Sequence, residues 1–251
     1  MANIWKSAFL TPSLSDAPEG ALSENRRLVL YGGGDFRENQ KLNKRLISLS
    51  ERKKPSITYI PSSSDYGRFE FVNFVEQFQK YKLNRFQYLP LDLPISETLL
   101  KESLKADIVF LSGGNTFYFL KSLRAKGMID RLRDFAKGGG VLAGLSAGAI
   151  LLTPRIQTAA YPSFDRDPNA VGIRNLKSLG VVDFEFFPHY SSSPRYRKAL
   201  EVYSRKLEVP LYGAPDGSGL VVRGREIQFV GNNTVFFGGM RFPLAAEPRK
   251  R

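Results

Sequence analysis

Short apolar segments that end at glycine or serine turns recur along this chain, and residues with helical spacing follow each of them. We expect strands at 27–31, 56–60, 85–89 and 107–111 and in the segment leading up to Ser146, and helices at 38–52, 69–81, 96–105, 116–123 and 128–137. These repeated strand–turn–helix units predict a doubly wound α/β fold, with a mostly parallel sheet and helices on both of its faces. In such sheets, ligands bind beyond the carboxyl ends of the strands.

The C-terminal part of the chain has a different pattern. Residues 219–230 form two strand-like segments around a glycine turn, which predicts an antiparallel β-hairpin, and residues 232–237 can add a third strand. Residues 162–175 show no periodicity and form the longest expected loop. We therefore expect an irregular lead-in at 1–25, one α/β domain at 26–243 and a basic tail at 244–251.

Composition narrows the class of protein further. The 251 residues are enough for one large domain with a substantial core, and no apolar run reaches the length of a membrane span. The apolar patch at 8–10 is too short for the core of a signal peptide. The chain has no cysteine, which excludes disulfides, thiolate zinc sites and a cysteine nucleophile, and fits the expected cytoplasmic location.

The net charge raises the question of a nucleic-acid partner. The formal charge is +13, which can indicate a nucleic-acid-binding surface. However, Lys and Arg are scattered along the chain, often beside Asp or Glu, and the one dense basic run is at 249–251. We therefore do not expect nucleic acid as a partner. A positive surface can instead speed the encounter with small acidic substrates.

The segment Gly144-Leu-Ser-Ala-Gly148 has the G-x-S-x-G pattern of a nucleophile elbow. A strand-like segment precedes it and an apolar helical segment follows, which is the context that the pattern requires. In such a turn, small neighbours allow a sharp reversal, and the hydroxyl of Ser146 would project from the sheet edge. A glycine-rich turn without chemistry is the alternative interpretation.

A serine nucleophile needs a base and a carboxylate that orients the base. The chain has a single histidine, His189, at the end of a short apolar strand-like segment, although packing in an aromatic cluster would also explain it. The favoured carboxylate is Asp216, in a Pro-Asp-Gly turn after another strand. Asp165, Asp167 and Glu185 are alternatives.

Two backbone amides are candidates for an oxyanion hole. The N–H of Ala147 follows the serine at the start of the expected helix, and Gly114 follows the strand that ends at residue 111. Asn115 and Thr116 come directly after Gly114 and can either cap the next helix or contact substrate.

No metal or dinucleotide site is expected. Residues 165–169 begin like a calcium loop, but Ala170 and Leu176 stand where glycine and the bidentate glutamate are needed. Residues 32–35 lack the G-x-G-x-x-G spacing of a dinucleotide site. We therefore expect no cofactor.

Five segments together resemble peptidase family S51, which includes aspartyl dipeptidase (peptidase E) and cyanophycinase. They occur in the family's order over residues 27–240 and read YGGG at 31–34, LSGGNT at 111–116, GLSAG at 144–148, FPH at 187–189 and DGS at 216–218. The resemblance implies a fold like that of class I glutamine amidotransferases, with serine in place of cysteine. It also implies that Ser146 is the nucleophile and His189 the base.

The resemblance is less direct for the acid. Family members carry Glu or Asp where Asp216 stands, whereas an aspartate used in some peptidase E relatives falls near Tyr161, where the nearest acid is Asp165. Peptidase E relatives also carry arginine after the histidine, and Arg195 and Arg197 lie in that stretch. Arginine suits the bidentate recognition of a substrate carboxylate.

Taken with the resemblance, these residues predict a metal-independent serine peptidase. Its substrates would be small peptides with an acidic residue, Asp, at the cleaved bond, and it would act as a monomer or homodimer. Two alternatives remain open. One is a cyanophycinase-like or other acyl hydrolase of the same fold, and the other is a non-catalytic module that binds a ligand or nucleic acid.

Overall fold

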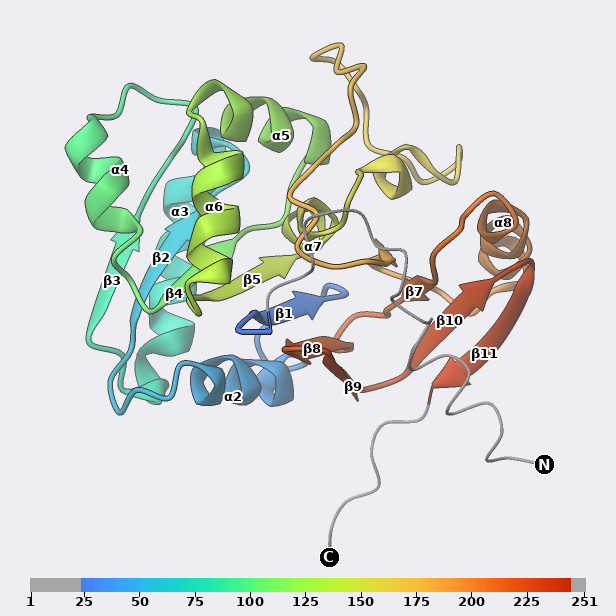
Figure 1. Ribbon diagram of the computed structural model, residues 1–251, viewed down its shortest axis with the longest axis horizontal. Coiled ribbons are helices and arrows are strands. Elements are labelled where there is room, and N and C mark those ends of the chain that lie inside the picture. The colour runs from blue at the N-terminus through green and yellow to red at the C-terminus, as the bar shows by residue number, and fades with distance from the viewer. Residues whose placement is uncertain (1–23, 245–251) are drawn as a thin grey trace, which may run out of the picture.

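The computed structural model describes residues 24–244 and contains a seven-stranded main sheet with the order β3-β2-β4-β5-β1-β8-β9 (Figure 1). Its strands are β1 (Arg27–Tyr31), β2 (Ser56–Ile60), β3 (Arg85–Tyr88), β4 (Ile108–Leu111), β5 (Val141–Leu145), β8 (Gly219–Arg223) and β9 (Glu226–Val230). The first five strands in the sheet order are parallel, while β8 and β9 form the expected antiparallel hairpin at the β1 side. The predicted fold class is confirmed. The expected basic tail and almost all of the lead-in lie outside the described residues.

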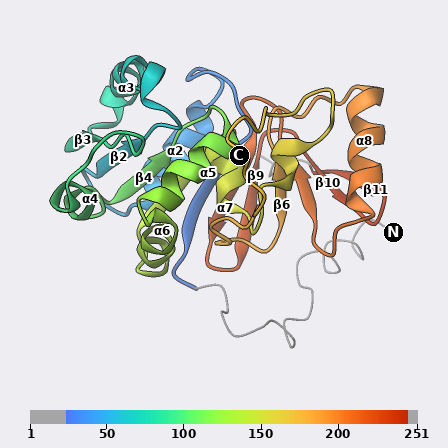
Figure 2. The ribbon, with the colours of Figure 1, turned by 90° about the horizontal axis from the view of Figure 1, so that it is seen from above.

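Helices cover both faces of the main sheet. They are α2 (Gln40–Leu49), α3 (Ser64–Phe78), α4 (Glu97–Ser103), α5 (Thr116–Ala125), α6 (Met128–Lys137) and α7 (Ala147–Leu152). The structure also has α8 (Pro194–Ser204), which packs on the C-terminal strands, and the short 3₁₀ segments η2 (Gln79–Tyr81) and η3 (Gln157–Ala160). One core cluster joins the sheet to α4, α5, α6 and α7, and a second joins it to α2 and α3. Figure 2 shows α4 and α6 on the opposite side of the strands from α3.

Strand β1 shows why the sheet is buried on both faces. Leu28 and Leu30 belong to the first core cluster, while Val29 and Tyr31 belong to the second. Successive side chains of a strand point to opposite faces, so an uninterrupted apolar strand needs cover on both sides. The helices that follow each strand supply that cover.

A second, four-stranded sheet lies beside the main one and was not expected from the sequence (Figure 1). It has the order β11-β10-β7-β6 and consists of β6 (Glu185–Phe187), β7 (Leu211–Gly213), β10 (Asn233–Phe237) and β11 (Met240–Leu244). The third strand expected at 232–237 is present as β10, but it pairs with β7 and β11 and not with β9. Gly231, with φ of 75°, turns the chain out of the main sheet before β10 begins.

Helix α3 begins five residues earlier than its apolar spacing predicts. The hydroxyl of Ser63 accepts a hydrogen bond from the N–H of Asp65, at 3.2 Å, and so caps the helix. Ser64 donates from its N–H and its hydroxyl to Asp92, at 2.7 and 2.9 Å. The first two turns carry the exposed side chains of Tyr66 and Phe69. Capping, and not burial, therefore determines where this helix starts.

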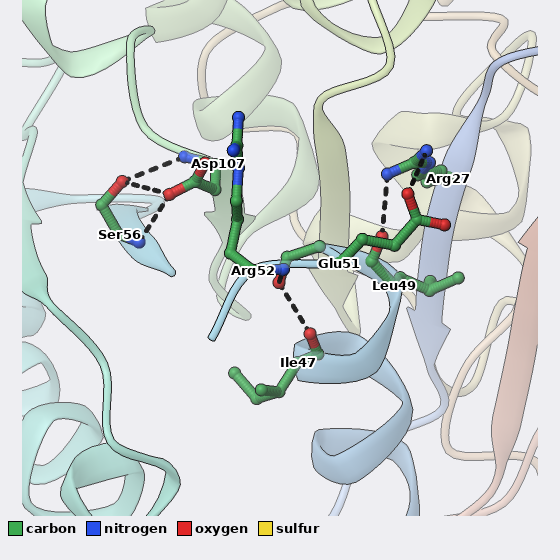
Figure 3. Close-up of polar contacts among 8 residues, drawn as sticks. Arg27, Ile47, Leu49, Glu51, Arg52, Ser56 and Asp107 are labelled. Atoms are coloured by element: carbon green, nitrogen blue, oxygen red, sulfur yellow. Dashed lines mark hydrogen bonds and ion pairs between the residues drawn. The ribbon is translucent and has the colours of Figure 1, made fainter. Parts of the chain in front are cut away.

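Polar contacts hold the segments at the amino ends of the strands (Figure 3). Asp107, just before β4, accepts hydrogen bonds from the N–H and the hydroxyl of Ser56, both at 2.8 Å. Arg52 lies 3.3 Å from the other carboxylate oxygen of Asp107, and Arg27 pairs with Glu51 at 2.9 Å. These contacts join the end of α2 to the starts of β1, β2 and β4. This edge of the sheet is therefore held by structural contacts, and the candidate site lies at the opposite edge.

Glu185 in β6 is a buried carboxyl group. Its side chain is 4% exposed, and its Oε2 atom has no hydrogen-bond partner among the described residues. Burial raises its pKa from 4.5 to about 7, although the charge of Arg155 acts in the opposite direction. The native state therefore keeps this proton over a pH range in which the unfolded chain has released it, and stability falls as the pH rises from 4.5 to about 7.

Glu185→Gln is expected to remove this pH dependence. The unfolding free energy of the variant minus that of wild type should increase by roughly 2 to 3 kcal/mol when the pH is raised from about 5 to about 8. Urea unfolding at the two pH values measures the difference. Glu76→Gln, at an exposed position of α3, is the control and should follow wild type. Parallel pH dependences for Glu185→Gln and wild type would contradict the prediction.

Candidate active site

Ser146 lies at the sharp turn between β5 and α7. Its backbone has φ of 52° and ψ of −110°, a conformation that non-glycine residues seldom adopt. The N–H of Ser146 donates to the carbonyl of Tyr31 at the end of β1, at 3.1 Å. A strained backbone persists where the surroundings hold it, and such residues concentrate at functional sites. The turn has the geometry that the G-x-S-x-G pattern predicts.

The two glycines of the pattern allow the backbone to pack closely around this turn. A Cβ atom on Gly144 would overlap the backbone of Gly148. A Cβ atom on Gly148 would overlap the carbonyl of Leu111, at the end of β4. Both positions therefore require glycine so that α7 can start directly above the ends of β4 and β5.

His189 reaches Ser146 from the second sheet. It follows β6, has φ of 52°, and donates its backbone N–H to the carbonyl of Gly32, at 2.6 Å. Its Nε2 atom lies 2.8 Å from the Oγ of Ser146. The serine comes from the main sheet and the histidine from a loop of the second sheet, so the relative position of the two sheets brings the pair together.

Asp216 lies on the other side of the same imidazole. It is in the loop between β7 and β8, and its Oδ1 atom is 2.7 Å from Nδ1 of His189. The side chains of His189 and Asp216 are both 49% exposed. Gly33 has no side chain to obstruct them, whereas a Cβ atom there would overlap both Asp216 and His189. The sequence placed the glycine run at 32–34 at a strand end and among the family segments, but its close approach to His189 and Asp216 was not expected.

The other candidate acids are placed differently. Asp165 accepts a hydrogen bond from the hydroxyl of Tyr196 at 2.6 Å, and Asp167 accepts one from the backbone N–H of Thr116 at 2.7 Å. Glu185 is buried in β6. Among residues 24–244, Asp216 is the carboxylate that hydrogen-bonds to the imidazole.

The two candidate oxyanion donors have available N–H groups. Within the described part of the chain, the N–H groups of Gly114 and Ala147 donate to no protein acceptor. Gly114 has φ of 126° and approaches Ser62 so closely that a Cβ atom would overlap its hydroxyl. Ala147 is the first residue of α7, where a helix leaves its N–H groups unpaired. Such N–H groups can donate hydrogen bonds to an anionic oxygen.

The four candidate substrate contacts are spread more widely. Asn115 caps α5 by accepting from the N–H of Tyr118 at 2.9 Å. Thr116 is 1% exposed, and its hydroxyl has no partner among the described residues. Arg195 stacks over the ring of Phe164, with its guanidinium carbon 3.4 Å from the ring centroid.

Two cavities meet at Ser146. The larger is a cleft of about 400 Å³ between the loop after β1 and helix α3, here called the α3 cleft. The smaller, of about 150 Å³, is lined by Thr116, Asp165 and Asp167 among others. Gly114, Ser146 and His189 line both cavities, whereas Arg195 and Arg197 line neither. The serine therefore has space for a ligand on two sides.

The described residues contain neither a metal-binding cluster nor a membrane-spanning helix. Among residues 24–244, no group of three or more His, Asp or Glu side chains is arranged to hold a metal ion. Within that range, every helix is too short or too polar to cross a membrane.

Comparison with known proteins identifies the family. The family model described as Peptidase family S51 matches residues 28–230, and the chain therefore belongs to this peptidase family. The uncharacterized peptidase YgaJ of Bacillus subtilis is 30% identical over 200 residues, covering 78% of this chain and 82% of that protein. Peptidase E of Escherichia coli O1:K1 is 28% identical over 155 residues, covering 57% of this chain and 65% of that protein.

A solved structure supports the fold. The crystal structure of a peptidase from an acI-B1 Actinobacterium superposes with a TM-score of 0.67 at 22% identity, covering 89% of this chain and 95% of that chain. This likeness supports the mixed α/β fold with its large, mostly parallel sheet. The chain is thus a family S51 peptidase with a mixed α/β fold.

Proposed function

We propose that this protein is a serine peptidase in which Ser146, His189 and Asp216 form the catalytic triad. The observation that carries the proposal is the continuous series of contacts from Ser146 Oγ to His189 Nε2, at 2.8 Å, and from His189 Nδ1 to Asp216, at 2.7 Å. These distances are within hydrogen-bond reach for proton transfer. Membership of a peptidase family supports the same reaction class.

The proposed reaction uses only groups of the protein. Ser146 Oγ attacks the scissile carbonyl while His189 Nε2 takes its proton and then passes that proton to the leaving amine. Asp216 accepts from the Nδ1–H of His189, which leaves Nε2 free to act as the base. The N–H groups of Gly114 and Ala147 stabilise the oxyanion. Water then hydrolyses the acyl-enzyme, with His189 again as base, and the carboxylic acid product leaves.

The proposed substrates are small peptides. The family resemblance makes dipeptides with aspartate at the cleaved bond the first compounds to test. Arg195 and Arg197, the carboxylate contacts expected from the sequence, line neither cavity at Ser146, so the geometry does not support that role for them. We also propose that residues 26–243 act as one unit, because the main sheet supplies Ser146 and the second sheet supplies His189. A cytoplasmic location and a monomeric or homodimeric state remain part of this proposal.

Labelling with a fluorophosphonate tests the nucleophile directly. We expect stoichiometric modification of Ser146, located by peptide mapping, because an activated serine attacks the electrophilic phosphorus. His189→Ala should slow the labelling strongly, since the serine loses its base. Labelling at another serine, or none at all under conditions in which the protein is folded, would refute the proposed role of Ser146.

A further inference from the structure

The α3 cleft is acidic in a basic protein. The chain has 37 Lys and Arg residues and a net charge of +13, but none of the described residues that line this cleft is Lys or Arg. Its charged lining residues are Asp35 and Glu70. The carboxylates of this lining therefore have the opposite sign of charge from the protein as a whole, and the basic group beside the lining is Lys80, whose Nζ lies 4.0 Å from the centroid of the Phe36 ring.

Both carboxylates lack a basic partner. Among residues 24–244, neither Asp35 nor Glu70 forms a salt bridge. Glu70 Oε2 accepts from the hydroxyl of Tyr59 at 3.3 Å, and within the same residues its Oε1 accepts from no group. Partial burial raises the pKa of Glu70, which the hydrogen bond from Tyr59 opposes. A cation bound in the cleft would supply the partner that this carboxylate lacks.

The walls of the cleft suit a long apolar stem. The rings of Tyr59 and Phe110 are stacked with their centroids 6.0 Å apart, and Phe74 packs 4.8 Å from Tyr59; all three line the cleft. Methylene groups of Lys or Arg pack favourably on such surfaces while the charged head seeks polar groups. Aromatic faces also attract cations.

Polar acceptors extend the acidic end of the cleft. Asn73 and Gln77 lie on α3 one and two turns beyond Glu70 and line the same cleft. Asn39 also lines it and is 5% exposed, and its Oδ1 atom has no hydrogen-bond partner among the described residues. An N–H donor from a ligand would satisfy such an acceptor.

We propose that the α3 cleft binds the basic side chain, Lys or Arg, of a residue that flanks the scissile bond, with Glu70 as its counter-charge. Ser146 and His189 line the same cleft, so a side chain held there belongs to a residue next to the reacting carbonyl. This assignment rests on the proposed function for its meaning in catalysis. The assignment is compatible with an aspartate on the other side of the scissile bond, because the smaller cavity also borders Ser146.

Dipeptides that differ only in the charge of one side chain test the proposal. Norleucine has the carbon chain of lysine without the ammonium group. The two pairs are Asp-Lys with Asp-norleucine, and Lys-Ala with norleucine-Ala. In at least one pair, we expect kcat/KM of wild type to be about 10- to 100-fold higher for the lysine peptide than for the norleucine peptide. Equal values within both pairs would overturn the proposal.

Glu70→Gln tests the counter-charge. The variant should reduce the lysine preference to about threefold or less, because the charged interaction is lost. Glu76→Gln, on the same helix but outside the lining of the cleft, is the matched control and should keep the preference. A lysine preference that persists in Glu70→Gln would overturn the assignment.

Binding to Ser146→Ala separates this proposal from the proposed function. Calorimetric titration of that variant with the same peptides needs no turnover. Tighter binding of the lysine peptide, by about tenfold, supports the cleft assignment even if wild type cleaves neither member, a result that would refute only the peptidase chemistry. Equal binding of lysine and norleucine peptides would refute the cleft assignment even if both are cleaved through Ser146.

Discussion

Replacing Ser146 with alanine is expected to lower kcat on the best peptide substrate by about 10⁴- to 10⁶-fold. The substitution removes the atom that lies 2.8 Å from His189 Nε2, and no acyl-enzyme can then form. The expected loss is of this size because triad members act as a unit, while substrate binding and the oxyanion donors remain. Initial rates of amine release at high enzyme concentration measure the residual activity.

Ser163→Ala is the control for this prediction. Ser163 is an exposed residue of the loop that follows η3, and its substitution should leave kcat within about twofold of wild type. Circular dichroism of both variants establishes that each is folded. A Ser146→Ala protein that keeps a tenth or more of the wild-type kcat would exclude the serine as nucleophile.

Asp216→Asn is expected to lower kcat by about 10³- to 10⁴-fold. An amide at this position can present its NH₂ group to Nδ1 of His189, 2.7 Å away in the native protein, and so favour the tautomer that carries its proton on Nε2. In that tautomer His189 can no longer accept the proton of Ser146. The side chain keeps almost the same size, so stability should change little.

Asp165→Asn is the matched substitution at one of the other acids that the sequence offered as the third member of the triad. Asp165 bonds to Tyr196 and not to His189, so its change to Asn should lower kcat by about tenfold or less. The comparison uses kcat for the same peptide in both variants. A larger loss in Asp165→Asn than in Asp216→Asn would transfer the role of the third residue to Asp165.

The local sequence was sufficient to predict most of the main sheet. The strands β1 and β2 and the helix α6 occur with the expected bounds, because apolar spacing and glycine or serine ends are local signals. The start of α3 was predicted wrongly: its cap, Ser63, is a local signal that the apolar spacing did not include, and Asp92, which holds Ser64, is distant in the sequence. The pairing of β10 with β7 could not be predicted for the same reason, because strand pairing depends on contacts between remote segments.

Two members of the candidate site were identified from local pattern, and Asp216 was favoured among several acids. Ser146 was identified because the glycines at 144 and 148 mark a turn in which only small neighbours fit. His189 was identified because the chain contains one histidine and it ends a strand-like segment. Both arguments rest on residue type and local pattern.

Local sequence patterns are sufficient to predict the alternating α/β architecture and the strained turn that presents Ser146, since hydrophobic periodicity and glycine sterics act over a few residues. Tertiary packing sets which acid meets His189, and it also places Arg195 against Phe164 and brings Asp35 and Glu70 into one cleft. These residues come from separate loops and helices, and their proximity depends on how the two sheets and α3 pack. Packing of that kind is a property of the whole chain, which no short segment encodes.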